Sequence, residues 1–105
     1  MAWKKVGYGD TLKNGVKGDP VCDVQRFLYL LKTPGIPFKT SDIDGLYGQK
    51  TVDGVKYYQA YGMGQVGKGV DGIVGPKTWS SMKKGYGTNA INPDAKGLKL
   101  TKYGC

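Results

Sequence analysis

Apolar side chains repeat with helical spacing in three stretches of the chain. The first stripe consists of residues spaced three, four and three apart: Val21, Val24, Leu28 and Leu31. This spacing places them on one face of a helix. Asp19-Pro20 is typical of a helix start, and Thr33-Pro34-Gly35 of a helix end. We therefore predict a helix from Asp19-Pro20 to about Lys32.

Two further stretches show the same periodicity. The second apolar face consists of Val52, Val55, Tyr58 and Gly62, and it predicts a helix from Gln49 to Tyr61. A third, shorter helix is predicted to start at Gly75-Pro76, to contain Trp79 and Met82, and to stop at Gly85. The glycines at positions 62, 64, 67 and 69 cannot sustain a helix, so they form the connection between the second and third helices.

Both ends of the chain alternate loosely between apolar and polar residues. The apolar positions are Trp3, Val6 and Tyr8 at one end and Leu98, Leu100 and Tyr103 at the other. Alternation is the pattern of a half-buried strand. It predicts a short β pairing between the two termini.

A short segment occurs twice. Positions 44–52 read DGLYGQKTV, and positions 71–79, which lie 27 residues later, read DGIVGPKTW. Besides the lysine, the shared positions are Asp44, Gly45, Gly48 and Thr51 in the first copy and Asp71, Gly72, Gly75 and Thr78 in the second. Aspartate in a turn accepts backbone amide hydrogen bonds, glycine adopts conformations closed to other residues, and threonine supports a first helical turn. Each copy is therefore predicted to be a turn that leads into a helix, with the apolar pair between its glycines in the core.

The composition argues against catalysis. The chain has eight acidic residues, all of them Asp, and no His. Without histidine there is no Ser-His or Cys-His pair and no histidine ligand for a catalytic zinc; without glutamate the commonest general acid of glycan cleavage is missing. Asp44 and Asp71 could be read as an acid pair or as metal ligands, but a calcium loop would need an acid where Thr51 stands. We predict no catalytic residue, no metal site and no cofactor.

The net charge of the chain narrows the choice of binding partners only partly. The formal net charge of +8 favours nucleic acid, teichoic acid or acidic membrane surfaces. The lysines are scattered, however, and keeping a small protein in solution explains them equally well. The N-terminal residues contain neither a secretory signal nor a membrane span.

The two cysteines, Cys22 and Cys105, are too few for a disulfide scaffold, and nothing near them has metal-ligand spacing. We expect two free thiols, with a bond from Cys22 to the C-terminus as the alternative.

Three motifs in order resemble a known family. The first is LKNGVKGDPV at positions 12–21, followed by Val24-Gln25 and Leu28. The second is DGLYG at positions 44–48, followed by Thr51, Gly54-Val55 and Tyr58-Gln59. The third is DGIVGPKTW at positions 71–79. Together they resemble the peptidoglycan-binding-domain-1 family, the wall-binding modules of many bacterial hydrolases and phage endolysins. The resemblance covers residues 12–82 and leaves 86–105 as a C-terminal extension.

The resemblance implies a mainly α fold, a compact three-helix bundle with two pseudo-symmetric halves, within a single domain of residues 1–105. It also implies non-catalytic binding of bacterial peptidoglycan, which would hold a lytic activity at the cell wall. Anionic wall polymers are expected as additional partners of a monomeric module. A phage-encoded protein released from the cytoplasm would need no signal peptide. The alternative is a small basic nucleic-acid-binding or phage accessory protein with the same fold.

Peptidoglycan offers sugar faces, acetamido groups and peptide carboxylates, so its receptor needs aromatic surface, amides and positive charge. The candidate ligand contacts are Gln25, Tyr29, Tyr57, Gln59 and Tyr61. Partial burial is the alternative for the tyrosines, and capping of buried backbone groups is the alternative for the glutamines. Trp79 is expected in the core, where the third helix meets the others.

Overall fold

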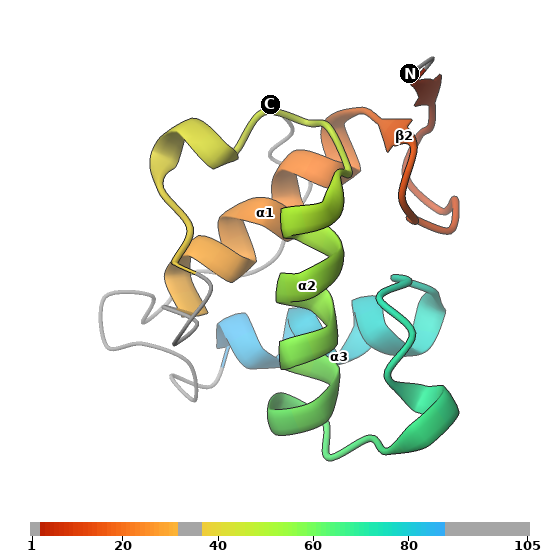
Figure 1. Ribbon diagram of the computed structural model, residues 1–105, viewed down its shortest axis with the longest axis vertical. Coiled ribbons are helices and arrows are strands. Elements are labelled where there is room, and N and C mark those ends of the chain that lie inside the picture. Colours follow the sequence, from red (N-terminus) through yellow and green to blue (C-terminus); the bar gives the residue numbers. More distant parts are fainter. Residues whose placement is uncertain (1–2, 32–36, 88–105) are drawn as a thin grey trace.

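Three helices cross one another and make up most of the fold (Figure 1). The computed structural model describes residues 3–31 and 37–87. Its helices are α1 (Asp19–Leu31), α2 (Gln49–Tyr57) and α3 (Pro76–Gly87), and its strands are β1 (Lys4–Lys5) and β2 (Val16–Lys17). Shorter helical turns are η1 (Thr40–Asp42), η2 (Tyr58–Gly62) and η3 (Gly67–Gly69). The predicted mainly helical architecture is confirmed. Within the described residues, no helix is long and apolar enough to cross a membrane.

Helix α1 supplies much of the core. Its predicted stripe is buried, with Val21, Val24 and Leu28 fully inaccessible to solvent. The helix begins at Asp19, as predicted, and the amide of Val21 donates to the carbonyl of Gly18 at 3.1 Å. Its predicted end at Lys32 lies outside the described residues. The hydrophobic periodicity and the start signal at Asp19-Pro20 therefore located this helix correctly.

Helix α2 changes its hydrogen-bond register in its last turn. The α-helical part ends at Tyr57, and η2 continues as a π-helix in which the amide of Met63 donates to the carbonyl of Tyr58 at 3.0 Å. The predicted helix to Tyr61 is thus correct in extent but wrong in type. Within this turn, the Tyr58 ring leaves no room for a side chain at Gly62, since a Cβ there would lie 2.5 Å from it. Such a wide turn is common at functional sites.

Helix α3 begins at Pro76, as predicted, and buries Met82 completely. It continues through Gly85 to Gly87, two residues further than predicted. Glycine favours a helix end only where it turns to a left-handed conformation, and it also fits helical dihedral angles. The presence of a glycine was therefore not sufficient to predict where α3 ends.

The N-terminal segment ties the two sequence repeats together. Strand β1 pairs in parallel with β2. The predicted pairing of the N-terminal segment with residues 98–103 falls on residues outside the described part. Two isolated antiparallel bridges follow, Lys17 with Leu46 and Leu12 with Val74. The segment thus contacts both repeat loops. Pairing within one short loop costs less chain entropy than pairing the two ends of the chain.

The core joins all three helices to the repeat loops. Its buried members are Leu12, Val16, Val21, Val24, Phe27, Leu28, Phe38, Tyr47, Val55, Tyr58, Val74 and Met82. Of each apolar pair between repeat glycines, the second member, Tyr47 or Val74, is buried, whereas the first is half-buried. Cys22 is buried as expected but is disulfide-bonded, which corrects the expectation of a free thiol. The alternative considered for Cys22, a disulfide bond, is thus the one found, and Cys105 lies outside the described residues.

Candidate functional site

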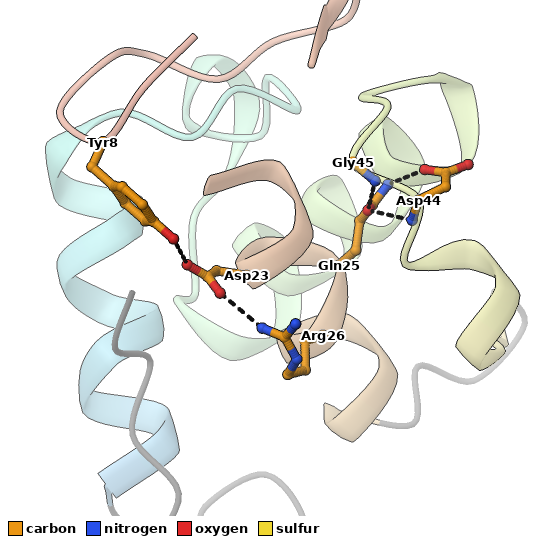
Figure 2. A network of polar contacts seen from close by, with 6 residues as sticks. All are labelled: Tyr8, Asp23, Gln25, Arg26, Asp44 and Gly45. Carbon is orange, nitrogen blue, oxygen red and sulfur yellow. Dashed lines mark hydrogen bonds and ion pairs between the residues drawn. The ribbon is translucent and has the colours of Figure 1, made fainter. Parts of the chain in front are cut away.

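The first repeat loop is folded around the side chain of Gln25, which comes from α1 (Figure 2). The Gln25 Oε1 accepts hydrogen bonds from the amides of Asp44 at 3.0 Å and Gly45 at 2.9 Å. Its Nε2 donates to the Asp44 carboxylate, the Leu46 carbonyl and the Thr51 hydroxyl at 3.0, 3.0 and 3.1 Å. Gln25 is only 1% exposed. One buried amide therefore satisfies the polar groups of a whole turn.

The second repeat loop has the same network around Gln59, which comes from η2. The Gln59 Oε1 accepts from the amides of Asp71 at 3.1 Å and Gly72 at 2.9 Å. Its Nε2 donates to the Asp71 carboxylate, the Ile73 carbonyl and the Thr78 hydroxyl at 2.9, 3.0 and 3.4 Å. The two halves are therefore equivalent in their hydrogen bonding as well as in their sequence.

These contacts define the roles of the repeated residues. Asp44 and Asp71 each accept the amide two residues ahead at 3.0 Å, as predicted for turn aspartates. Gly45 and Gly72 adopt φ of 78° and 72°, which only glycine tolerates at little cost. The prediction is wrong for Gly48, whose φ of −98° is open to other residues, and for Gly75, which likewise has no positive φ. Of the two roles considered for the glutamines, the geometry places both amides in the capping of backbone groups.

A tyrosine joins the two loops. The Tyr47 hydroxyl donates to the carbonyl of Gly72 at 2.6 Å, and the side chain is fully buried. Burial raises the pKa of Tyr47 far above its usual value, and the nearby Asp71 carboxylate adds to the effect. The phenol therefore stays protonated and locks the second turn to the first.

A groove of about 370 Å³ lies where the N-terminal loop meets the starts of α1 and α3. Residues 8–12 form one wall, Pro20 stands at the start of α1, and Gly75 with Pro76 and Trp79 forms the wall from α3. Asp10 and Thr11 contribute a carboxylate and a hydroxyl and are exposed. The groove thus combines two aromatic rings with a few polar groups, which is the usual make-up of a ligand site.

Tyr8 is held in this groove by a buried carboxylate. Its hydroxyl donates to Asp23 of α1, and the other oxygen of Asp23 accepts from Arg26 at 2.7 Å (Figure 2). Asp23 is fully buried, whereas Arg26 is partly exposed. Burying a carboxylate is costly unless it has such hydrogen-bond and charge partners. The Tyr8 ring is therefore fixed by its polar end, and its orientation is set before a ligand arrives.

Trp79 has two roles. It packs against the core, as predicted, and it also lines the groove. Its ring lies edge-on to Tyr8, with the centroids 6.2 Å apart and an interplanar angle of 66°. Two rings at such an angle form a corner against which the apolar face of a sugar can pack.

The predicted tyrosines form a separate surface. The Tyr57 and Tyr61 rings lie 4.7 Å apart, and Tyr61 is 76% exposed. Tyr29, on α1, is 37% exposed and makes no ring contact with this pair among the described residues. The structure therefore brings two of the three candidates together and leaves the third apart.

Sequence reasoning missed Tyr8 and Thr11 as site residues. Tyr8 was placed only in a terminal strand, because its partner Asp23 is 15 residues away and no periodicity connects the two. A possible signal was the loop Gly7-Tyr8-Gly9-Asp10, since an aromatic residue between glycines is unlike a core position. Across the described residues, no group of three His, Cys, Asp or Glu side chains is arranged to hold a metal ion.

A family model described as "Putative peptidoglycan binding domain" matches residues 17–82. A probable N-acetylmuramoyl-L-alanine amidase of Bacillus licheniformis is 41% identical over 68 residues, which are 64% of this chain and 18% of the amidase. A spore cortex-lytic enzyme of Halalkalibacterium halodurans is 32% identical over 96 residues, which are 89% of this chain and 26% of that enzyme. The chain thus spans about a fifth to a quarter of these relatives. No solved structure matches significantly.

Proposed function

Because the chain belongs to this peptidoglycan-binding domain family, we propose that it binds bacterial peptidoglycan without cleaving it and holds a lytic activity at the cell wall. The ligand lies in the groove between Tyr8 and Trp79. The observation that carries this proposal is the pair of aromatic rings at the mouth of a polar groove, on a fold whose family model describes peptidoglycan binding.

The groove suits a glycan with acetamido groups. The Trp79 and Tyr8 rings offer faces for sugar C–H groups, which stack on aromatic surfaces as apolar patches do. The Asp10 carboxylate accepts the amide of Gly7 at 2.8 Å through one oxygen, and its other oxygen is available for an acetamido N–H. Thr11 supplies a hydroxyl that both donates and accepts. Recognition therefore rests on stacking for affinity and on two polar groups for orientation.

The relatives support a role beside an enzyme. Both are named for lytic or amidase activity, and this chain corresponds to only a small part of either. A module of this kind raises the local concentration of an enzyme on a polymeric substrate, where even micromolar single-site binding, about 8 kcal/mol, suffices. The lysine excess adds a salt-sensitive attraction to anionic wall polymers.

The test is sedimentation of the purified protein with bacterial sacculi from which teichoic acids have been stripped. We expect wild-type protein to co-sediment and Tyr8→Ala to bind about tenfold more weakly, because truncation removes one stacking wall. Tyr29→Ala is the matched control, since this partly exposed tyrosine lies outside the groove. Circular dichroism would verify that each variant is folded.

Two results would contradict the proposal. One is loss of wild-type sedimentation after stripping, which would assign binding to the anionic polymers. The other is a shift of duplex DNA in a gel without binding to sacculi, which would favour the nucleic-acid alternative.

A further inference from the structure

The internal repeat extends further upstream than the Asp-Gly motif. The same offset of 27 residues relates η1 to η3, which both precede a repeat loop. In η1 the amide of Asp42 donates to the Lys39 carbonyl at 2.9 Å; in η3 the amide of Gly69 donates to the Val66 carbonyl at 3.1 Å. The next amides, of Ile43 and Val70, repeat the pattern at 3.1 Å in both copies. Asp42 and Gly69 therefore occupy equivalent positions.

In the first copy, this position holds Asp42, whose carboxylate pairs with a lysine. The Asp42 carboxylate accepts from Lys50 Nζ at 2.7 Å and from the backbone amide of Lys39 at 2.7 Å. Lys50 comes from the first turn of α2 and also lies 5.3 Å from the centre of the Phe38 ring. The hydrogen bond from Lys50, followed by that from the Lys39 amide, lowers the pKa of Asp42. The site thus favours the charged form of a carboxyl group.

In the second copy, the lysine is present and the carboxylate is not. Lys77 occupies the position of Lys50 in the first turn of α3, but Gly69 has no side chain to offer it. In the part of the chain that the structure describes, Lys77 has no acidic partner. An open depression of about 680 Å³ lies beside it, and Gln65, Ser80 and Ser81 also line this space.

The surroundings of Lys77 complete a receptor for an anion. Ser80 and Ser81 follow Lys77 by three and four residues, so all three lie on one face of α3. The Ser81 hydroxyl is hydrogen-bonded to the Tyr58 hydroxyl at 2.6 Å, so Ser80 is the hydroxyl beside Lys77 that has no hydrogen-bond partner among the described residues. Gln65 stands where the first copy has Phe38, so an amide donor replaces an aromatic ring. The positive end of the α3 dipole lies in the same turn as Lys77.

We infer that the second repeat is a carboxylate-binding site, in which a ligand carboxylate pairs with Lys77 as Asp42 pairs with Lys50 in the first repeat. The ligand class is a short peptide with a free carboxylate, and under the proposed function this is the stem peptide of peptidoglycan. The inference rests on that function for the source of the peptide. The inference adds a peptide site on α3 to the glycan groove. Pro76 lines both sites, so they adjoin each other.

The experiment measures calorimetric affinity for a soluble disaccharide-peptide fragment and for the same fragment with its carboxylates converted to amides. We expect the wild type to bind the acid about fivefold more tightly than the amide, the scale of one partly exposed ion pair. Lys77→Gln should abolish this preference. Lys68→Gln is the matched control, because it removes the same charge from an exposed lysine outside the depression.

A second pair of variants separates charge from shape. Gly69→Asp supplies the carboxylate that the first repeat has, so it should occupy Lys77 and lower affinity for the acid about fivefold. Gly69→Asn has the same size without the charge and should lower affinity for the acid less than Gly69→Asp does. Both side chains displace the Gln65 side chain in the same way, since the new Cβ would lie 2.3 Å from Gln65 Oε1 and 3.0 Å from Gln65 Cβ.

The outcomes distinguish this inference from the proposed function. Equal affinity of the wild type for acid and amide, or equal losses in Gly69→Asp and Gly69→Asn, overturns the carboxylate site and leaves binding in the groove intact. Failure of the wild type to bind either fragment overturns the proposed function and the inference with it.

Discussion

The two halves of the molecule share a scaffold and differ at the surface. Both fold a glycine turn around one buried glutamine and start a helix from it. The positions that differ between them include Phe38 and Gln65, Asp42 and Gly69, and Val52 and Trp79. Phe38 and Asp42 line a depression of about 240 Å³ on the first half, whereas Gln65 and Trp79 line larger ones that involve the second half. The shared positions thus maintain the fold, and the differences give each half its own surface.

The largest effect should come from removing either buried glutamine. Gln25→Ala and Gln59→Ala each leave several buried backbone groups without partners, so each should lower the free energy of unfolding by about 3–4 kcal/mol. Urea denaturation measures both. Gln49→Ala is the control, because this exposed side chain bonds only to Asp53, and it should cost less than about 0.5 kcal/mol. A large loss in one half alone would break the equivalence of the two loops.

A smaller loss of stability is expected when either repeat-loop glycine with a positive φ is replaced. Gly45→Ala should cost about 1–2 kcal/mol because its positive φ strains any side chain. Gly72→Ala has the same strain, and its Cβ would also lie 2.7 Å from Val52 Cγ1, so this contact should add about 1 kcal/mol to the strain. Thermal unfolding of Gly72→Ala with and without Val52→Ala would test this. An equal loss in both backgrounds would show that Val52 moves aside freely.

The hydrogen bond from Tyr47 that links the halves should contribute less to stability than the buried glutamines do, and its contribution depends on pH. Tyr47→Phe leaves the buried carbonyl of Gly72 without its donor and should cost about 1–2 kcal/mol. Because burial raises the pKa of Tyr47 in the folded protein, its contribution is complete below about pH 10 and is lost as the pH rises beyond the pKa of the unfolded phenol. Wild-type stability should therefore fall more steeply than that of Tyr47→Phe in alkaline titrations. Parallel curves would contradict this.

The smallest effect concerns the surface ion pair of the first half. Asp42→Asn should lower stability by less than about 1 kcal/mol, because the pair with Lys50 is partly exposed. Since the pKa of Asp42 is lowered, its contribution is present at neutral pH and disappears as the pH falls below about 4. Salt should reduce the difference between variant and wild type. A large, salt-independent loss would indicate that Asp42 shapes η1 rather than pairing with Lys50.

The sequence predicted those features that depend on local pattern. The apolar stripe of α1 and the turn role of Asp44 and Asp71 follow from spacing and side-chain chemistry, and both are confirmed. The glutamines were ambiguous, because an amide beside a buried stripe suits a ligand contact as well as a capped loop. Only the fold places the Asp44 turn against Gln25, which is 19 residues away in sequence.

The candidate groove was beyond such reasoning for a related reason. Tyr8 gains its position from Asp23, and the pair meets only when the N-terminal segment crosses α1. The π-helical turn at η2 was likewise not predicted, because the apolar spacing does not distinguish it from an α-helical turn. The equivalence of Asp42 and Gly69, by contrast, could be found by extending the alignment of the two repeats upstream.

The most direct test of this account is a two-dimensional NMR titration of the protein with soluble peptidoglycan fragments. The account predicts that the shifts concentrate on the second half and its N-terminal wall, at Tyr8, Thr11, Gly75, Lys77 and Trp79. Shifts centred on Tyr57 and Tyr61, with those residues unaffected, would contradict it.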